Sequence, residues 1–373
     1  MLLNVNLSYI SSELFSPCCC LDLQSLADYP LAVCNDGTAA TYYKDDTDEE
    51  SADKVLIHLN GGGSCYDADT CYQRCLVSSP NLCTASTDPV LRKTKGIWSS
   101  DPVENPPFHD YRKVNVPYCS SDLYIGNKTH QFGELSINFS GKNIIEAVVT
   151  ELMPMLKTAK RVVLIGDSAG GFGTSYNCDF VADMVHARNA DAEVFCVANA
   201  NNFGPDWIRL EGCDLEASVK QGLVFWGGHA DESCEKANPG HHEMCAIFTS
   251  YYEHVTTPFF VAVSYTDIHH GLHPCNPNYP QNPEYWDKWR FGMFQLATNF
   301  TQSEPRKGLF LVNCPAHSIS SEGYMWDEIS IEAEGEDMIQ KYTILNWLED
   351  NGEPYQAIDK YNVINEDCRY EGY

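Results

Sequence analysis

Several features of membrane, zinc-binding and nucleic-acid-binding proteins are missing from this chain of 373 residues. No run of about 18 or more apolar residues occurs, so we expect no membrane-spanning helix. Lysine and arginine number 24 against 52 aspartate and glutamate, and a net charge of −28 argues against a nucleic-acid partner. No cysteine pair has the C-x-x-C spacing of zinc ribbons. Linkers, charge runs and internal repeats are also missing, which favours one large domain.

Cysteine, by contrast, is abundant. The 17 cysteines are too many for a reducing compartment. Their odd number leaves at least one thiol free or paired between chains. Cys65, Cys71, Cys75 and Cys83 lie close together in the sequence and predict a disulfide-stapled loop.

Four Asn-x-Ser/Thr sequons fit the same secretory route, with acceptors at Asn6, Asn127, Asn138 and Asn299. We therefore expect a protein that is secreted or resides in the secretory lumen. Residues 1–30 lack the basic and apolar regions of a signal peptide, so we expect them to be irregular or the remnant of a targeting segment. Residues 31–373 are expected to form a single catalytic domain.

The most informative stretch is residues 166–171, which read Gly-Asp-Ser-Ala-Gly-Gly. They follow the apolar run 162–165 and precede a helix-like segment. This G-x-S-x-G pattern is typical of the nucleophile elbow of serine hydrolases, in which a tight strand-to-helix turn exposes the serine oxygen. The pattern predicts Ser168 as a nucleophile, although a simple glycine-rich loop would read the same way.

A second glycine-rich turn strengthens this interpretation. The buried-strand pattern at 54–59 leads directly into residues 60–65, Asn-Gly-Gly-Gly-Ser-Cys. Hydrolases with a nucleophile elbow place part of the oxyanion hole in such an early loop. Backbone N–H groups there stabilise the negative charge that develops on the ester carbonyl oxygen. We expect Gly62, Gly63 and Ala169 to supply them.

A serine nucleophile needs a base and an orienting acid, which in this fold follow later strands in the order acid, then histidine. Asp267 follows the apolar run 259–264, and His317 follows the run 308–312. Both therefore fall where catalytic groups belong. His58 precedes the glycine loop and is expected to be a packed strand residue.

The chain resembles the pectin acetylesterase/Notum family of serine carboxylesterases over residues 31–320. The resemblance rests on several motifs in the same order, namely residues 32–38 with the tyrosines at 42–43, 58–65, 166–171, the Cys-Asp pair at 178–179, and 314–318. It implies an α/β-hydrolase-like enzyme that needs no cofactor. It also implies Ser168 as nucleophile, Asp267 as orienting acid and His317 as general base.

The chain departs from the family pattern near the expected substrate pocket. The family usually has an acidic residue at the position of Asn60 and a tryptophan at that of Ser64. Residues 198–203 replace an acidic, aromatic block of the family. We expect Asn60, Ser64, Phe203 and Trp207 to contact substrate, although aromatic residues of this region are more often simply core.

Apolar runs alternate with helical patterns along the chain. Strands are expected at 55–59, 114–116, 162–165, 194–198, 259–264 and 308–313, and helices near 142–157, 172–188, 285–300 and 337–350. Such alternation predicts an α/β fold with a mostly parallel sheet covered on both faces. The cysteine-rich stretch 66–135 is expected to fold as loops over the site, and 201–255 as a second insertion.

The expected function is ester hydrolysis by a monomer, with removal of acetyl groups from a polysaccharide such as pectin as the first interpretation. Removal of a fatty acyl group from a protein is the alternative that the resemblance to Notum allows. A catalytically silent binding protein on the same fold also remains open. A metal site from His241, His242, His269, His270 and His273 has suitable spacing, but solvated loop histidines are the simpler interpretation, and we expect no metal.

Overall fold

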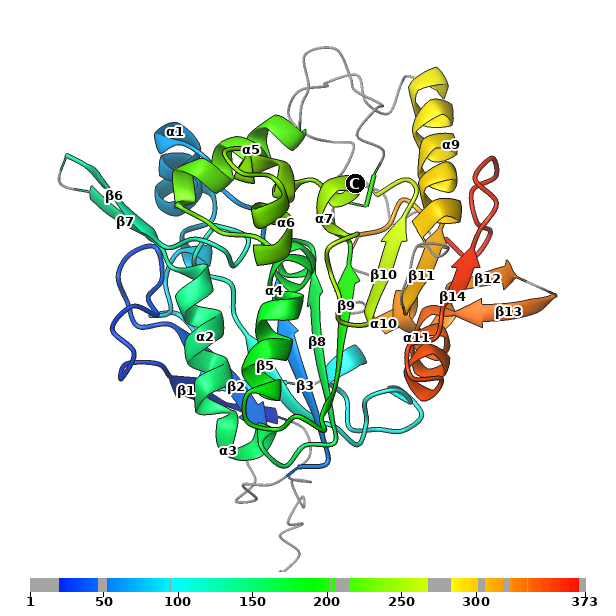
Figure 1. The fold of residues 1–373 in the computed structure, drawn as a ribbon, viewed down its shortest axis with the longest axis horizontal. Helices are drawn as coiled ribbons and strands as arrows, with labels where there is room; N and C mark the ends of the chain where they lie inside the picture. The colour runs from blue at the N-terminus through cyan, green and yellow to red at the C-terminus, as the bar shows by residue number, and fades with distance from the viewer. Residues whose placement is uncertain are drawn as a thin grey trace, which may run out of the picture.

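The computed structural model describes residues 20–45, 52–93, 95–133, 135–201, 203–204, 215–267, 283–300, 306–317, 323–333 and 335–368. A ten-stranded sheet forms the centre of the molecule (Figure 1). Its order across the sheet is β14 (Tyr355–Ile358), β11 (Lys307–Val312), β10 (Phe259–Ser264), β9 (Glu193–Asn199), β8 (Arg161–Asp167), β3 (Lys54–Leu59), β5 (Arg112–Val116), β2 (Thr41–Asp45), β1 (Cys20–Ser25) and β4 (Leu91–Lys93).

The strands from β14 to β5 pair in parallel, whereas β5–β2, β2–β1 and β1–β4 pair antiparallel. Parallel neighbours need crossover connections, and helices supply most of them. Because helices then cover both faces, the central strands are apolar along their whole length. Every residue of β10 and β11 is buried.

Helices and short helical turns occupy the connections. The longer ones are α2 (Gly141–Glu151), α4 (Ala169–His186), α5 (Leu215–Trp226), α9 (Pro283–Phe300) and α11 (Gln340–Glu349). The shorter ones are α1 (Ala68–Tyr72), η1 (Gln73–Ser78), η2 (Pro80–Leu82), η3 (Gly96–Trp98), α3 (Met153–Leu156), α6 (Glu232–Ala237), η4 (His242–Ala246), α7 (Phe248–Tyr251) and α10 (Gly323–Glu328). Two hairpins, β6 (Lys128–Phe132) with β7 (Leu135–Phe139) and β12 (Ser330–Ala333) with β13 (Glu336–Ile339), stand apart from the main sheet.

Two hydrophobic cores lie on opposite faces of the sheet. Val55 and Ile57 of β3 belong to the core that includes Val181 of α4. Leu56, between them, belongs to the core that includes Trp347 of α11. Alternate residues of one strand point to opposite faces, so this division places α4 and α11 on the two sides. The fold is an α/β-hydrolase-like sandwich, as the sequence predicted.

Every expected strand occurs. Each lies inside an observed strand or differs from it by one residue at either end. The helix expected at 142–157 divides into α2 and α3, with Pro154 in the first turn of α3, where a missing N–H is tolerated. The helix expected from 337 begins only at Gln340, because residues 336–339 pair with β12. The first strand, β1, falls within residues 1–30 and lies in the main sheet.

The described residues of the cysteine-rich stretch 66–135 form short helical turns and the strands β4, β5 and β6, none of them longer than six residues. In Figure 1, α1 and α5 both lie toward the end of the sheet where the arrows of β8, β9 and β10 point. Within the ranges described above, no helix is both long and apolar enough to cross a bilayer.

Candidate active site

Ser168 lies at the turn between β8 and α4. Its φ of 56° and ψ of −121° are outside the regions that L-residues prefer. The turn is compact because a Cβ at Gly166 would lie 2.2 Å from Gly170 O, and one at Gly170 would lie 2.0 Å from Leu59 O. Only glycine permits these approaches. Ser168 is partly exposed and forms the N-cap of α4, where the positive end of the helix dipole favours developing negative charge.

The glycine loop that follows β3 contacts this turn directly. A Cβ at Gly61 would lie 2.8 Å from Ser168 Cβ and 2.6 Å from Asp167 O. Gly62 and Gly63 have φ of +149° and +69°, values that other residues rarely adopt. The loop that the sequence assigned to the oxyanion hole therefore lies against the predicted nucleophile.

Hydrogen bonds hold both ends of the glycine loop. Asn60 N donates to Val116 O at 3.0 Å, and Tyr124 Oη donates to Asn60 O at 3.0 Å. At the other end, Cys65 N donates to Ser121 O at 3.2 Å, and Trp226 Nε1 donates to Cys65 O at 2.6 Å. Such bracing preorganises backbone donors, which is how an oxyanion hole lowers a barrier without reorganising during the reaction.

A buried acid and an arginine lie behind this loop. Asp122 is fully buried and accepts from Ser120 Oγ at 2.6 Å and Gly141 N at 2.7 Å. Burial raises the pKa of Asp122 to about 6, against the lowering effect of these donors. Arg74 Nε donates to Ser121 Oγ at 2.6 Å, and burial lowers the pKa of Arg74. These contacts fix the segment that supports Cys65.

The structure brings the predicted base and acid together. His317 Nδ1 lies 2.7 Å from Asp267 Oδ2, with the Asp267 side chain 1% exposed and that of His317 17% exposed. The two residues follow the neighbouring parallel strands β10 and β11. Tyr265 N donates to Val312 O at 2.8 Å, which ties together the two loops that carry them.

Ser168 follows β8, which is two strands away from β10 in the same parallel region. The carboxyl ends of parallel strands meet at one edge of a sheet, which is where ligands bind in open α/β folds. Ser168, Asp267 and His317 therefore share this edge. A nucleophilic hydroxyl, a carboxylate-oriented imidazole and a preorganised glycine loop together are suited to acyl transfer.

Comparison with known proteins identifies the family of the chain. The sequence model described as pectinacetylesterase matches residues 20–369. The chain belongs to the pectinacetylesterase family.

Members of this family and a solved structure extend the comparison. Palmitoleoyl-protein carboxylesterase notum2 of Xenopus laevis is 34% identical over 62% of the chain and 49% of its own length. The chain thus spans about half of that relative. Pectin acetylesterase 5 of Arabidopsis thaliana is 26% identical over 93% of the chain and 84% of its own length. The structure of the Wnt deacylase Notum from Drosophila superposes with a TM-score of 0.80 at 26% identity, covering 94% of this chain and 99% of that one.

Of the positions that depart from the family pattern, Asn60 lies close to the elbow, since a Cβ at Gly170 would lie 2.9 Å from Asn60 O. Asn60 Oδ1 accepts from Asn115 Nδ2 at 2.7 Å, and Ser64 is partly exposed at the end of the glycine loop. Phe203 is fully buried and packs against Phe248, with ring centroids 4.8 Å apart. Its contact with substrate stays a prediction, and Trp207 lies outside the described residues.

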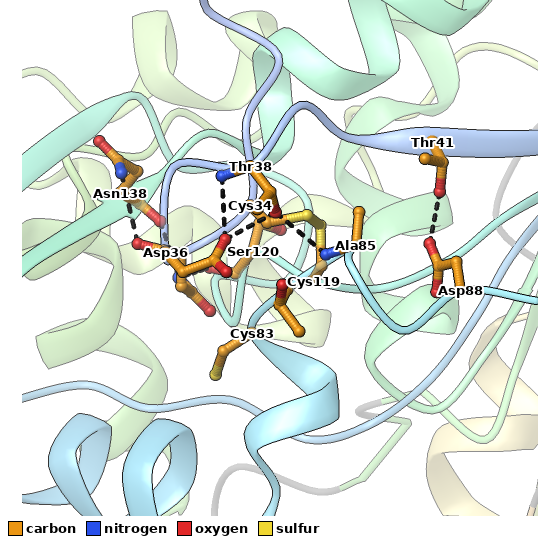
Figure 2. Close-up of a disulfide and its surroundings, with 12 residues drawn as sticks. Cys34, Asp36, Thr38, Thr41, Cys83, Ala85, Asp88, Cys119, Ser120 and Asn138 are labelled. Carbon is orange, nitrogen blue, oxygen red and sulfur yellow. Dashed lines mark hydrogen bonds between the residues drawn. A yellow bond between two sulfur atoms is a disulfide. The ribbon is translucent and has the colours of Figure 1, made fainter. Parts of the chain in front are cut away.

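Among the thirteen cysteines that the structure describes, twelve form six disulfides: Cys34–Cys119, Cys65–Cys71, Cys75–Cys83, Cys178–Cys196, Cys234–Cys245 and Cys314–Cys368. Two of these bridges confirm the stapled loop that the sequence predicted beside the glycine turn. Cys20 has a free thiol. Figure 2 shows Cys34–Cys119, beside which Ala85 N donates to Thr38 Oγ1 at 3.0 Å.

The predicted glycan acceptors differ in their surroundings. Asn127 and Asn299 are exposed, whereas Asn138 is half-buried. Asn138 Nδ2, the atom that would carry a glycan, donates to Asn35 O at 3.3 Å, and Asn138 Oδ1 accepts from Thr129 Oγ1 at 2.9 Å. Asn6 lies outside the described residues.

Two of the five histidines considered for a metal site are described. His241 Nδ1 lies 3.1 Å from Glu243 Oε1, and His242 Nδ1 lies 3.6 Å from Glu235 Oε2. The histidines at 269, 270 and 273 lie outside the described ranges. Among the residues described, no group of three or more His, Cys, Asp or Glu side chains is arranged to hold a metal ion.

His58 has a buried partner that no sequence pattern predicted. This residue is 1% exposed, and its Nε2 lies 2.8 Å from Asp167 Oδ2, immediately before the predicted nucleophile. A histidine in an otherwise apolar strand and an aspartate inside the elbow were the two available signals. Each was visible in the sequence, but their proximity depends on strand register.

Proposed function

We propose that this chain is a secreted serine carboxylesterase with Ser168 as nucleophile, His317 as general base and Asp267 as orienting acid. The observation that carries the proposal is the 2.7 Å contact between His317 Nδ1 and Asp267 Oδ2, at the sheet edge that also holds the strained turn of Ser168. With Nδ1–H donated to the carboxylate, Nε2 is the basic nitrogen of His317.

The reaction follows two-step acyl transfer. His317 Nε2 takes the proton of Ser168 as the serine oxygen attacks the ester carbonyl. The N–H groups of Gly62, Gly63 and Ala169 stabilise the oxyanion, and His317 then protonates the leaving alcohol. Water, activated by the same histidine, hydrolyses the acyl-enzyme. No step of this sequence requires a cofactor.

We propose acetyl groups on a polysaccharide such as pectin as the substrate. The support is the similarity to pectin acetylesterase 5, which extends over 93% of this chain and 84% of that relative. The disulfides and the exposed sequon asparagines support an extracellular or cell-wall location.

A fatty acyl group on a protein is the second candidate. It is favoured by the 34% identity to the palmitoleoyl-protein carboxylesterase of Xenopus and by the TM-score of 0.80 to the Wnt deacylase of Drosophila. The two candidates share the chemistry at Ser168 and differ in the length of the acyl chain that the enzyme accepts.

Hydrolysis of p-nitrophenyl acetate, butyrate and octanoate by purified protein tests both candidates. Activity that is highest on acetate and vanishes in Ser168→Ala supports the polysaccharide acetylesterase. A maximum at octanoate favours the protein deacylase instead. Folded protein with no activity on any ester, or undiminished activity in Ser168→Ala, would contradict the proposal.

A further inference from the structure

A network of buried polar side chains lies beneath the nucleophile elbow. Asp167 is 4% exposed, His58 1%, and Asn115 and Asn199 0%. They occupy paired positions in the parallel sheet, since His58 is opposite Asn115 and Asp167 is opposite Asn199. Burying a carboxylate costs free energy unless strong hydrogen bonds accompany it, so an apolar residue would be the simpler occupant of this position.

The direction of each hydrogen bond in this side-chain network follows from Arg92. Arg92 Nη1 can only donate, and it lies 2.7 Å from Asn115 Oδ1. The amide nitrogen of Asn115 must therefore face the other way, where it lies 3.1 Å from His58 Nδ1 and 2.7 Å from Asn60 Oδ1. Because His58 Nδ1 accepts, the ring proton is on Nε2, which donates to Asp167 Oδ2 at 2.8 Å.

Asn199 holds the other side of the elbow. Its side-chain Nδ2 donates to Asp167 Oδ1, and its backbone carbonyl accepts from Ser168 N at 3.0 Å. A Cβ at Gly171 would lie 2.2 Å from that carbonyl, so the first turn of α4 is packed against the same residue. The residues before, at and after the nucleophile are therefore all fixed to β9.

We propose that Asp167 is a positioning residue for the esterase reaction. It touches no substrate. It fixes the strained backbone of Ser168 through Asn199, and through His58 and Asn115 it sets the position of Asn60, where the glycine loop begins. The network thus holds the nucleophile and the oxyanion donors in one relative geometry. This inference rests on the proposed function of Ser168.

The complementarity of donors and acceptors provides a sharp test. In Asp167→Asn, the new amide nitrogen faces either the N–H of His58 or Nδ2 of Asn199, and both of these groups donate in the wild-type arrangement. Asn199 must therefore turn its amide over before it can accept. In Asp167→Asn/Asn199→Asp, the substituted amide can accept from His58 and donate to the new carboxylate. The double variant therefore restores the hydrogen bond from His58 and the one between residues 167 and 199, and it moves the charge across to β9.

We expect Asp167→Asn to lower kcat about 10-fold to 100-fold while KM changes less than about 2-fold, since small displacements of reacting groups have effects of this size. Asn199→Asp places two carboxylates together and is expected to lower kcat as well. The double variant is expected to recover kcat to within about 5-fold of wild type, a strong positive coupling between contacting residues.

Rates are to be expressed per active site, titrated with a fluorophosphonate that labels reactive serines, so that misfolded protein does not count. Asp231→Asn is the matched control because Asp231 is also a buried carboxylate, 7% exposed, that caps α6 and accepts from Cys234 N at 2.9 Å. It is expected to lower stability without changing kcat per titrated site.

Wild-type kcat per titrated site in Asp167→Asn would overturn the inference, as would a double variant no more active than the product of the two single effects. A fall in melting temperature alone would assign the network a purely structural role and equally overturn it. Failure of the proposed function is distinguishable, because it would appear as undiminished esterase activity in Ser168→Ala.

Discussion

At the scale of single residues, close backbone approaches surround Ser168. The φ of 56° at this residue is a strained value of the kind found at functional sites, with a typical cost of about 1–3 kcal/mol. Neighbouring glycines permit it because they leave no Cβ between the strand, the loop and the helix. Substitutions at these glycines should therefore affect catalysis more than folding.

Gly61→Ala tests the contact between the glycine loop and the elbow. The new Cβ would lie 2.6 Å from Asp167 O, so the loop must move and displace the oxyanion donors. We expect kcat to fall about 100-fold to 1,000-fold, the effect of losing one such donor.

Gly240→Ala is the control, since the φ of Gly240 is +81° and a Cβ there meets nothing within 4 Å. It should cost about 1 kcal/mol of stability and leave kcat unchanged. Equal kcat in the two variants would contradict the assignment of the loop.

Glycan occupancy is expected to follow the environment of each acceptor nitrogen. Asn127 and Asn299 are exposed and should carry glycans when the protein is expressed in a eukaryotic secretory pathway. Asn138 Nδ2 is engaged with Asn35 O, so Asn138 should remain largely unmodified. Deglycosylation in heavy-oxygen water followed by peptide mass spectrometry measures each site. Full occupancy at Asn138 would show that glycan addition precedes formation of this contact.

At the scale of elements, the disulfides divide into those that stabilise the fold and those that shape the site. Cys34–Cys119 spans 85 residues and joins the turn before β2 to the segment after β5 (Figure 2). Cys65–Cys71 spans only 6 residues and begins where the glycine loop ends. The entropy removed from the unfolded chain grows with the length of the closed loop.

Removing each bridge as a pair of serines should separate these roles. Cys34→Ser/Cys119→Ser is expected to lower the free energy of unfolding by about 4–5 kcal/mol, and Cys65→Ser/Cys71→Ser by about 2 kcal/mol. The second variant should show the larger fall in kcat, because its bridge holds the oxyanion loop. Urea unfolding and initial rates on p-nitrophenyl acetate measure the two quantities. A reversed order of stability losses would contradict the division.

The central strands were predictable because parallel strands buried on both faces read as short apolar runs, as in β10. The antiparallel edge was missed. Its strand β1 alternates polar and apolar residues and has only one fully buried side chain, which gives no clear apolar run. That Ser168, Asp267 and His317 share one edge of the sheet was predictable from their places after strands, while their catalytic roles remain a proposal. The Asp167–His58 contact was not, because it requires the register of β8 against β3, which no local pattern encodes.

At the scale of the whole molecule, buried lysines and tyrosines should shape stability in alkaline solution. Burial lowers the pKa of Lys307, which is 1% exposed, to about 8, against the opposing effect of Asp179. Lys307 Nζ nevertheless donates to Val255 O at 2.7 Å. Burial also raises the pKa of Tyr42 and Tyr111 to about 12.

The sign of the lysine effect follows from proton binding. Between about pH 8 and 10.5 the unfolded chain keeps the proton of Lys307 and the folded chain loses it, so this residue makes stability rise with pH, by up to about 1.4 kcal/mol per pH unit. Buried tyrosines have the opposite effect above about pH 10, where the tyrosines of the unfolded chain ionise first and stability falls as the pH rises.

Lys307→Met tests this effect. We expect the free energy of unfolding of wild type, measured relative to that of Lys307→Met, to increase from pH 8 to 9.5. Urea unfolding at both values measures it, and a constant difference would contradict the assignment.

The central claim, that Ser168 is an activated nucleophile, is tested most directly by intact-protein and peptide mass spectrometry after incubation with a fluorophosphonate. We expect a single adduct on the peptide that contains Ser168, no adduct in Ser168→Ala, and much slower labelling in His317→Ala, which lacks the proposed base. An unlabelled but folded wild-type protein, or an adduct on another serine that persists in Ser168→Ala, would contradict it.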